Sequence, residues 1–162
     1  MRVRNIHQRT IGSSEQLGAL LDTLATDADR LWPGDRWPRL RLDASLGVGA
    51  RGGHGPVRYR VELYESSRRV RFRFERPRGL HGTHEFCVVA DGDAPAQLVH
   101  VLDARMSGAA RLSWPLVFRP LHNALIEDAL DNAERHVTGQ LQRPAHWSTY
   151  VRTLRRVLAV AR

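Results

Sequence analysis

The spacing of apolar residues changes its period partway along the chain, and this change constrains the fold more than any other feature of the sequence. Between residues 57 and 106 apolar and polar residues largely alternate. A period of two is typical of antiparallel strands that have one face in water. From Ser113 to about Thr138 apolar residues recur every three or four positions, which predicts a single long amphipathic helix. The sequence therefore predicts an α+β fold in which a meander of strands precedes the helix.

The rest of the chain adds elements on both sides of this pattern. A hydroxyl cap at Ser13 and Ser14 precedes a leucine-rich helix, and a second amphipathic helix follows Gly139 and Pro144. Tight turns are expected at residues 65–68 and 91–95. The expected strands are residues 2–11, 39–43, 47–53, 57–63, 70–75, 83–90 and 97–106.

Length and composition narrow the class of protein. A chain of 162 residues with 42% hydrophobic residues fits one ordinary domain and is too apolar for a disordered tail. No segment approaches the roughly 20 apolar residues of a membrane-spanning helix, and the N-terminal residues lack the apolar centre of a signal peptide. We therefore expect a soluble, cytoplasmic protein. Its one cysteine, Cys87, excludes an intramolecular disulfide and gives no sign of a thiolate metal site.

The positive charge is a weak indicator of function. The net charge is +8, and all 25 basic residues are arginine. Four arginines on neighbouring strands point outward, but no outward row of aromatic residues accompanies them to stack on bases. We interpret this face as a solvated convex surface and expect no nucleic-acid partner, although an interaction module acting through the face is an alternative. The four residues are Arg58, Arg60, Arg71 and Arg73.

The order of elements, with three short motifs, resembles the START-like helix-grip superfamily, also called SRPBCC or polyketide cyclase-like. The motifs are Arg9-Thr10-Ile11 before the first helix, Leu46 to Arg51 before the central hairpin, and Ser107-Gly108 before the long helix. The resemblance covers residues 1–138. Residues 139–162 form an extension that lies outside it. The motifs reflect structural requirements of the backbone, so they indicate the fold and not a particular activity.

The resemblance implies a curved, seven-stranded antiparallel sheet wrapped around the long helix, with a cavity between them. Members of the superfamily are carriers, sensors or cyclases that hold an apolar or aromatic small molecule. The alternation supplies an apolar inner wall of the kind that ligand sites favour. A solid core made of the same side chains is the alternative. The strand residues expected to face inward are Val57, Tyr59, Val61, Leu63, Val70, Phe72, Phe74, Phe86, Val88, Leu98, Leu102 and Met106.

Several polar residues share this inner wall. His84 alternates in step with Phe86, and His100 in step with Leu102. In the superfamily the first strand lies beside the last, and in that arrangement His7 and Arg9 join the same surface, with Val88 expected opposite His100. We expect a polar strip that binds the polar end of a ligand. The full set of expected ligand contacts is Arg9, His7, His84, His100, Tyr59, Phe72, Phe74, Phe86, Leu102, Trp114, Phe118 and Leu121.

Two functions fit such a strip. The first is binding of a hydrophobic, lipid-like or aromatic small molecule. The second is a polyketide aromatase or cyclase in which the inward histidines and Arg9 transfer protons. The pocket entrance is expected at Trp32, Trp37, Arg51 and His54. The glycine-rich loop of residues 49–56 lacks the following helix and the Gly-Lys-Ser/Thr ending of a phosphate loop.

Other chemistry is not indicated. No Gly-x-Ser-x-Gly motif or catalytic cysteine signature is present, and His81 and His84 lie at a spacing that does not favour a metal site. We therefore expect no metal and no cofactor. The acids of the long helix, Glu127, Asp128, Asp131 and Glu134, are interpreted as its solvated face.

One outward-facing group of apolar residues requires a cover. Cys87, Val89, Val99 and Val101 are expected on the convex side of neighbouring strands. We expect the C-terminal helix to dock on them, within its own chain or across a homodimer. Adsorption of this basic helix on a membrane surface is the alternative.

Overall fold

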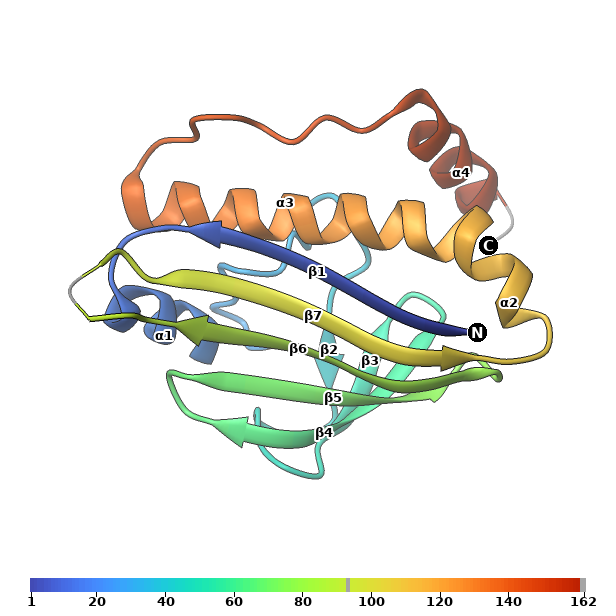
Figure 1. Ribbon diagram of the computed structural model, residues 1–162, viewed down its shortest axis with the longest axis horizontal. Helices are drawn as coiled ribbons and strands as arrows, with labels where there is room; N and C mark the ends of the chain where they lie inside the picture. Colours follow the sequence, from blue (N-terminus) through green and yellow to red (C-terminus); the bar gives the residue numbers. More distant parts are fainter. Residues whose placement is uncertain (93, 161–162) are drawn as a thin grey trace.

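Seven antiparallel strands form one sheet in the order β1-β7-β6-β5-β4-β3-β2, and a long helix crosses its concave face (Figure 1). The structure is a computed structural model that describes residues 1–92 and 94–160. Asp93, in an expected turn, and residues 161–162, at the end of the expected extension, lie outside the described residues. The predicted α+β helix-grip fold is confirmed.

The strands and helices have the following bounds. The strands are β1 (Arg2–Thr10), β2 (Arg41–Leu42), β3 (Arg51–His54), β4 (Val57–Glu65), β5 (Arg69–Arg76), β6 (Leu80–Val89) and β7 (Gln97–Met106). The helical segments are α1 (Ser14–Asp22), α2 (Ala110–Ser113), η1 (Trp114–Phe118), α3 (Arg119–Thr138) and α4 (Thr149–Val160).

The register places the first strand beside the last, as predicted. His7 of β1 lies opposite His100 of β7, and Asn5 and Arg9 share the inward face of β1 with His7. On the other side of β7, Phe86 and not Val88 lies opposite His100. The expected pairing is wrong by two residues, because β6 and β7 pair from Val89 opposite Gln97, which places the centre of their connection one residue earlier than Val88 opposite His100 requires.

A bulge in β4 changes which side chains face the core. The register between β4 and β5 shifts at Glu62, so Leu63 lies opposite Arg71 and Tyr64 lies opposite Val70. The extra residue of a bulge reverses the alternation beyond it. The prediction that Leu63 faces inward is therefore wrong, and Tyr64 packs against the core in its place.

Helix α1 begins where its sequence predicts. Ser13 accepts a hydrogen bond from the backbone N–H of Gln16, and the Gln16 side chain accepts one from the N–H of Ser13. This reciprocal pair is a capping box, which satisfies two free donors of the first turn. The helix packs closely on the β4–β5 turn, since a Cβ added at Gly18 would lie 2.5 Å from the Ser67 carbonyl oxygen.

The long helix starts earlier than expected and contains a π-helical turn. It runs from Ala110 rather than Ser113, through η1, to Thr138. Within η1 the N–H of Arg119 donates to the Trp114 carbonyl five residues earlier. Prolines at positions 115 and 120 have no N–H to donate, which disturbs the regular α-helical pattern. At the other end Gly139 adopts the left-handed conformation that ends the helix (φ 73°).

The core consists of two clusters of buried residues. The larger one joins α1, the loop around Trp32, strands β4 to β6 and the second half of α3. The smaller one lies near the start of the long helix and includes Leu102, Met106 and Trp114.

The C-terminal extension returns along α3 as an irregular segment and ends in α4, beside the first turns of the long helix (Figure 1). The Tyr150 hydroxyl donates to the Leu116 carbonyl (2.6 Å), a group to which Pro120 has no N–H to offer. Val151 is buried, whereas Val89 on the convex sheet face stays exposed. Within the chain, the expected docking of this helix on the patch around Cys87 is therefore wrong, and docking across a homodimer stays a prediction.

Within the described residues, no helix has the length and apolar character needed to cross a membrane.

Candidate functional site

A cavity of about 300 Å³ lies between the sheet and the first half of the long helix, where the two core clusters meet. Its volume is at the lower end of the range for small-molecule sites. The interior is therefore hollow at this point, and the alternative of a solid core does not hold there. The lining residues are Trp32, Trp37, Pro38, His54, Gly55, Pro56, Val57, Phe74, Leu80, His84, His100, Leu102, Trp114, Val117, Phe118, Leu121, His122, Leu125, Ile126, Arg155 and Leu158.

The expected ligand contacts divide into two groups. Seven of them line the cavity, namely His84, His100, Phe74, Leu102, Trp114, Phe118 and Leu121. Five do not, namely Arg9, His7, Tyr59, Phe72 and Phe86. Of the expected entrance residues, Trp32, Trp37 and His54 line the cavity. Arg51 does not, and its exposed side chain lies 3.8 Å from Glu75.

The aromatic residues outside the cavity support the histidines from behind. Phe72 stacks on His84 with ring centroids 5.0 Å apart, and Phe86 packs edge-on against His100 at 4.6 Å. Tyr59 is completely buried, and its hydroxyl has no hydrogen-bond partner. Alternation in a strand correctly assigns these residues to the inner face, but not to the layer that touches a ligand.

Three imidazoles form a row along the cavity wall. His84 Nδ1 and His100 Nε2 are 3.4 Å apart, and the rings of His100 and His122 are separated by 5.1 Å. The other nitrogens of His84 and His100 and both nitrogens of His122 are buried and have no hydrogen-bond partner among the described residues. Buried polar groups of proteins are nearly always hydrogen-bonded. Four unpartnered nitrogens at one cavity wall therefore indicate a site that a polar ligand group can complete.

His122 was missed by the sequence analysis. It lies on α3, four residues after Phe118 and three before Leu125, so it occupies the apolar stripe that faces the sheet. The helical period therefore contains a signal that identifies His122 as an inward-facing residue.

The cavity keeps its imidazoles neutral. Burial, with a smaller contribution from the charge of His7, lowers the pKa of His122 to about 3. Burial and the charge of Arg58 lower the pKa of His54 to about 4. Burial also holds the pKa values of His84 and His100 well below 6.5. A neutral imidazole has one donor and one acceptor nitrogen, so the row can bind carbonyl and hydroxyl groups.

Arg9 and His7 belong to a separate, satisfied network on α3. The Arg9 guanidinium donates to Asp131 (2.6 Å), Glu134 (2.9 Å) and Glu127 (3.1 Å). His7 contacts Glu127 through Nδ1 at 2.7 Å. Burial lowers the pKa of Arg9, but Asp131 and the other two acids outweigh this effect and raise it overall. The polar atoms of Arg9 are thus used within the protein, which does not support its expected role as a ligand contact.

The interpretation of the α3 acids as a solvated face is wrong for three of them. Asp128, Asp131 and Glu134 are buried at 1%, 4% and 9% exposure. The C-terminal extension covers them, and the backbone N–H of Ala145 donates to Asp131. An amphipathic pattern cannot reveal this cover, because it distinguishes one helix face from the other but not what lies on either.

The extension also contributes to the cavity wall, since Arg155 and Leu158 of α4 are among the lining residues. Asp128 accepts hydrogen bonds from Arg36, Trp37 and Trp147, at 2.7 to 2.9 Å. The Arg155 guanidinium lies over the ring of Trp147 at 3.9 Å and over that of Trp37 at 4.3 Å.

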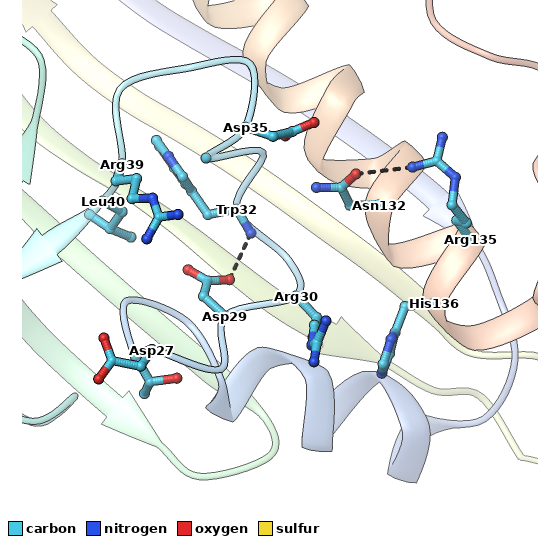
Figure 2. Close-up of a pocket in the computed structure, with 12 residues that line it drawn as sticks. Asp27, Asp29, Arg30, Trp32, Asp35, Arg39, Leu40, Asn132, Arg135 and His136 are labelled. Atoms are coloured by element: carbon cyan, nitrogen blue, oxygen red, sulfur yellow. Dashed lines mark hydrogen bonds between the residues drawn. The ribbon is translucent and has the colours of Figure 1, made fainter.

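A second hollow shares Trp32 with the cavity and is lined mainly by charged and polar residues (Figure 2). Its volume is about 510 Å³, but most of its side chains are exposed. The carboxylate of Asp29 accepts the backbone N–H groups of Leu31 and Trp32, so its role is to shape the loop. Among the described residues, none of the polar side-chain atoms that line this groove is buried without a hydrogen-bond partner, unlike those of the apolar cavity.

In the described part of the chain, no group of three or more histidine, cysteine or acidic side chains is arranged to hold a metal ion.

No protein family and no curated protein matches the sequence. Solved structures do match the fold. Norcoclaurine synthase from Thalictrum flavum, in complex with dopamine and hydroxybenzaldehyde, aligns with a TM-score of 0.63 at 15% identity over 88% of this chain and 90% of that one. CalU16 from Micromonospora echinospora aligns with a TM-score of 0.56 at 16% identity over 99% and 84%.

The di-domain ARO/CYC StfQ from the steffimycin biosynthetic pathway aligns with a TM-score of 0.63 at 12% identity, over 86% of this chain and 51% of that one. These likenesses show that the chain has the helix-grip fold. At such low identities they show the fold alone.

Proposed function

We propose that the protein binds a hydrophobic small molecule, aromatic or lipid-like, in the cavity between the sheet and the long helix. The observation that carries this proposal is the hollow itself, an apolar chamber of about 300 Å³ with unpartnered imidazole nitrogens in its wall. A core that served only for stability would gain from filling such a space, because each void loses packing contacts.

The lining suggests which parts of a ligand lie where. Phe74, Leu102, Trp114 and Phe118 offer apolar surface for the body of the molecule. The histidine row offers neutral hydrogen-bonding groups for a carbonyl or hydroxyl. Leaving these nitrogens unpartnered costs about 1 to 3 kcal/mol each, so a matching polar group on the ligand gains affinity.

The structural neighbours support a guest of this size. The matched norcoclaurine synthase structure holds dopamine and hydroxybenzaldehyde, which are small aromatic molecules with polar substituents. The fold alone does not transfer these ligands to the present chain. It supports only the same general use of the space.

Native mass spectrometry of the protein purified from its own host tests the proposal. We expect a retained adduct whose mass identifies the ligand. The variant Leu121→Trp fills the cavity from α3 and should lose the adduct. The matched variant Leu112→Trp adds the same bulk at a position that is 73% exposed and should keep it. Adduct retention by Leu121→Trp, or its absence from the wild-type protein, would contradict binding in this cavity.

A polyketide aromatase or cyclase is a second candidate, favoured by the convergence of His84, His100 and His122 on one wall. Their lowered pKa values make them weak bases, since protonation would place a charge in an apolar chamber. This favours hydrogen bonding over proton abstraction. Comparing the mass of the bound molecule with the mass of the released one discriminates the two functions. A carrier releases its ligand unchanged, whereas a dehydrating cyclase releases a product that is lighter by one water.

The arginine-rich convex face is less suited to be the functional surface. Arg71 pairs with Glu85 at 2.6 Å, and Arg73 pairs with Glu62 at 2.5 Å. These pairs reduce the free positive charge that an acidic partner would meet.

A further inference from the structure

We propose that the ligand carries an acidic group, and that Arg155 of the C-terminal extension binds this group at the cavity mouth. This inference rests on the proposed function and adds to it the chemical class of the ligand. The ligand is thus an apolar acid whose body enters the chamber and whose anionic group stays at the rim.

Arg155 is held in place before any ligand arrives. Its guanidinium lies over the rings of both Trp37 and Trp147, and Nη2 donates to the Arg36 carbonyl. Stacking on two indoles restricts a side chain that would otherwise lose much rotamer freedom on binding. A restrained cation at a cavity wall is therefore prepared for an anion.

The charge of Arg155 lacks a direct counterion in the described part of the chain. Asp128 is the nearby acid, but Arg36, Trp37 and Trp147 already donate to both of its oxygens. Arg155 Nη1 is buried and has no hydrogen-bond partner within residues 1–92 and 94–160. Arg155 is also one of the residues that line the apolar cavity.

The balance of charge around this arginine favours an anion. Burial lowers the pKa of Arg155, and the charge of Arg36 lowers it further, against the opposing effect of Asp128. A half-buried cation that lacks a partner is costly, and a carboxylate, phosphate or sulfonate oxygen at Nη1 would remove this cost. The imidazoles deeper in the cavity are neutral, so they offer no competing positive charge.

Two fluorescent probes with the same ring system separate charge from apolar fit. 8-Anilinonaphthalene-1-sulfonate carries an anionic group, and N-phenyl-1-naphthylamine lacks it. Both emit strongly in apolar cavities. We expect the wild-type protein to bind the sulfonate more tightly, and Arg155→Gln to weaken the sulfonate about tenfold while changing the affinity for the neutral probe little.

The control is Arg156→Gln, which removes the same charge from an exposed position on the same helix. It should leave both affinities unchanged. If Arg155→Gln displaces the extension, both probes are affected, and the ratio of their affinities still reports the loss of the charge contact.

The outcomes distinguish the two proposals. If the ratio of the sulfonate affinity to the neutral-probe affinity falls in Arg155→Gln but not in Arg156→Gln, the result supports an anion contact at Arg155. An unchanged ratio, or an equal change in Arg156→Gln, overturns the role of Arg155 and leaves the cavity proposal intact. If the wild-type protein binds neither probe, both proposals are overturned.

Discussion

Two polar sites lie between the long helix and the neighbouring strands β1, β7 and β6, and they differ in whether their hydrogen bonds are complete. At one site Arg9 is surrounded by Glu127, Asp131 and Glu134, and each acid accepts a hydrogen bond from it. At the other site the imidazoles of His84, His100 and His122 leave four nitrogens without partners. A complete network stabilises the fold, whereas an incomplete one next to a cavity is available to a ligand.

The two sites differ because the C-terminal extension covers one of them and the other borders the cavity. Around Arg9 the extension closes over the helix, and the backbone of Gln142 and Ala145 adds donors to the acids. Around the histidines the π-helical turn and the aromatic side chains leave open space. The same helix thus anchors the sheet at one end and stands away from it at the other.

The largest expected effect is the loss of Arg9. In Arg9→Met the buried carboxylates of Asp131 and Glu134 lose their counterion, and we expect the free energy of unfolding to fall by about 3 to 5 kcal/mol. Urea denaturation measures this change. The control Arg4→Met removes an exposed arginine from the same strand and should change stability little. Equal stability of the two variants would show that the Arg9 network is not structural.

The two sites should contribute differently to the pH dependence of the free energy of unfolding. An unfolded histidine is protonated below about pH 6.5, whereas His122 in the folded protein stays neutral down to about pH 3. Because the unfolded state binds more protons in this range, the free energy of unfolding falls as the pH falls. The loss between pH 7 and pH 5 is about 2 kcal/mol for each such histidine. The pKa of Glu127 is lowered mainly by its hydrogen bond to His7, so its contribution persists until the pH drops through the range below 4.5.

The variant His122→Leu should therefore lose about 2 kcal/mol less stability than the wild-type protein between pH 7 and pH 5. Urea denaturation at the two pH values measures the difference. Parallel losses in both proteins would indicate that His122 titrates as it does in the unfolded chain.

The smallest expected effect has the opposite sign to that of Arg9→Met. At pH 7.5 His122→Leu removes two unpartnered nitrogens and keeps a side chain of similar volume, so the free energy of unfolding should rise by about 1 kcal/mol. A rise in thermal midpoint is the measurement. A clear loss of stability would mean that the nitrogens of His122 are satisfied in solution, and the contrast between the two sites would fail.

Local sequence patterns predicted the regular elements well. Alternation identified β7 at its observed bounds, Gln97–Met106, and the helical stripe with Gly139 identified the end of α3 at Thr138. These patterns succeed because each reflects a single element that places one face in the core. They failed at Glu62, where a bulge inserts one residue and no side chain signals it.

The candidate site was predictable in part. The inward parity of His84 and His100 follows from strand alternation, and both line the cavity. His7 and Arg9 share that parity, yet the acids of α3 engage them, because the helix lies over this part of β1. Arg155 lies 17 residues beyond Thr138, where the helical stripe ends, and no pattern in the sequence connects it with Trp37.

The sequence by itself determined the order of strands and helices along the chain and, except beyond the bulge in β4, the faces that the strands turn inward, because these depend on periods of two and 3.6 residues within one element. Only the tertiary structure decided which polar side chains meet partners and which face empty space. That outcome depends on distances between segments far apart in the chain, such as the 2.6 Å between Arg9 and Asp131 or the buried, unpartnered Nη1 of Arg155. Such distances follow from how whole elements pack, which local periodicity does not encode.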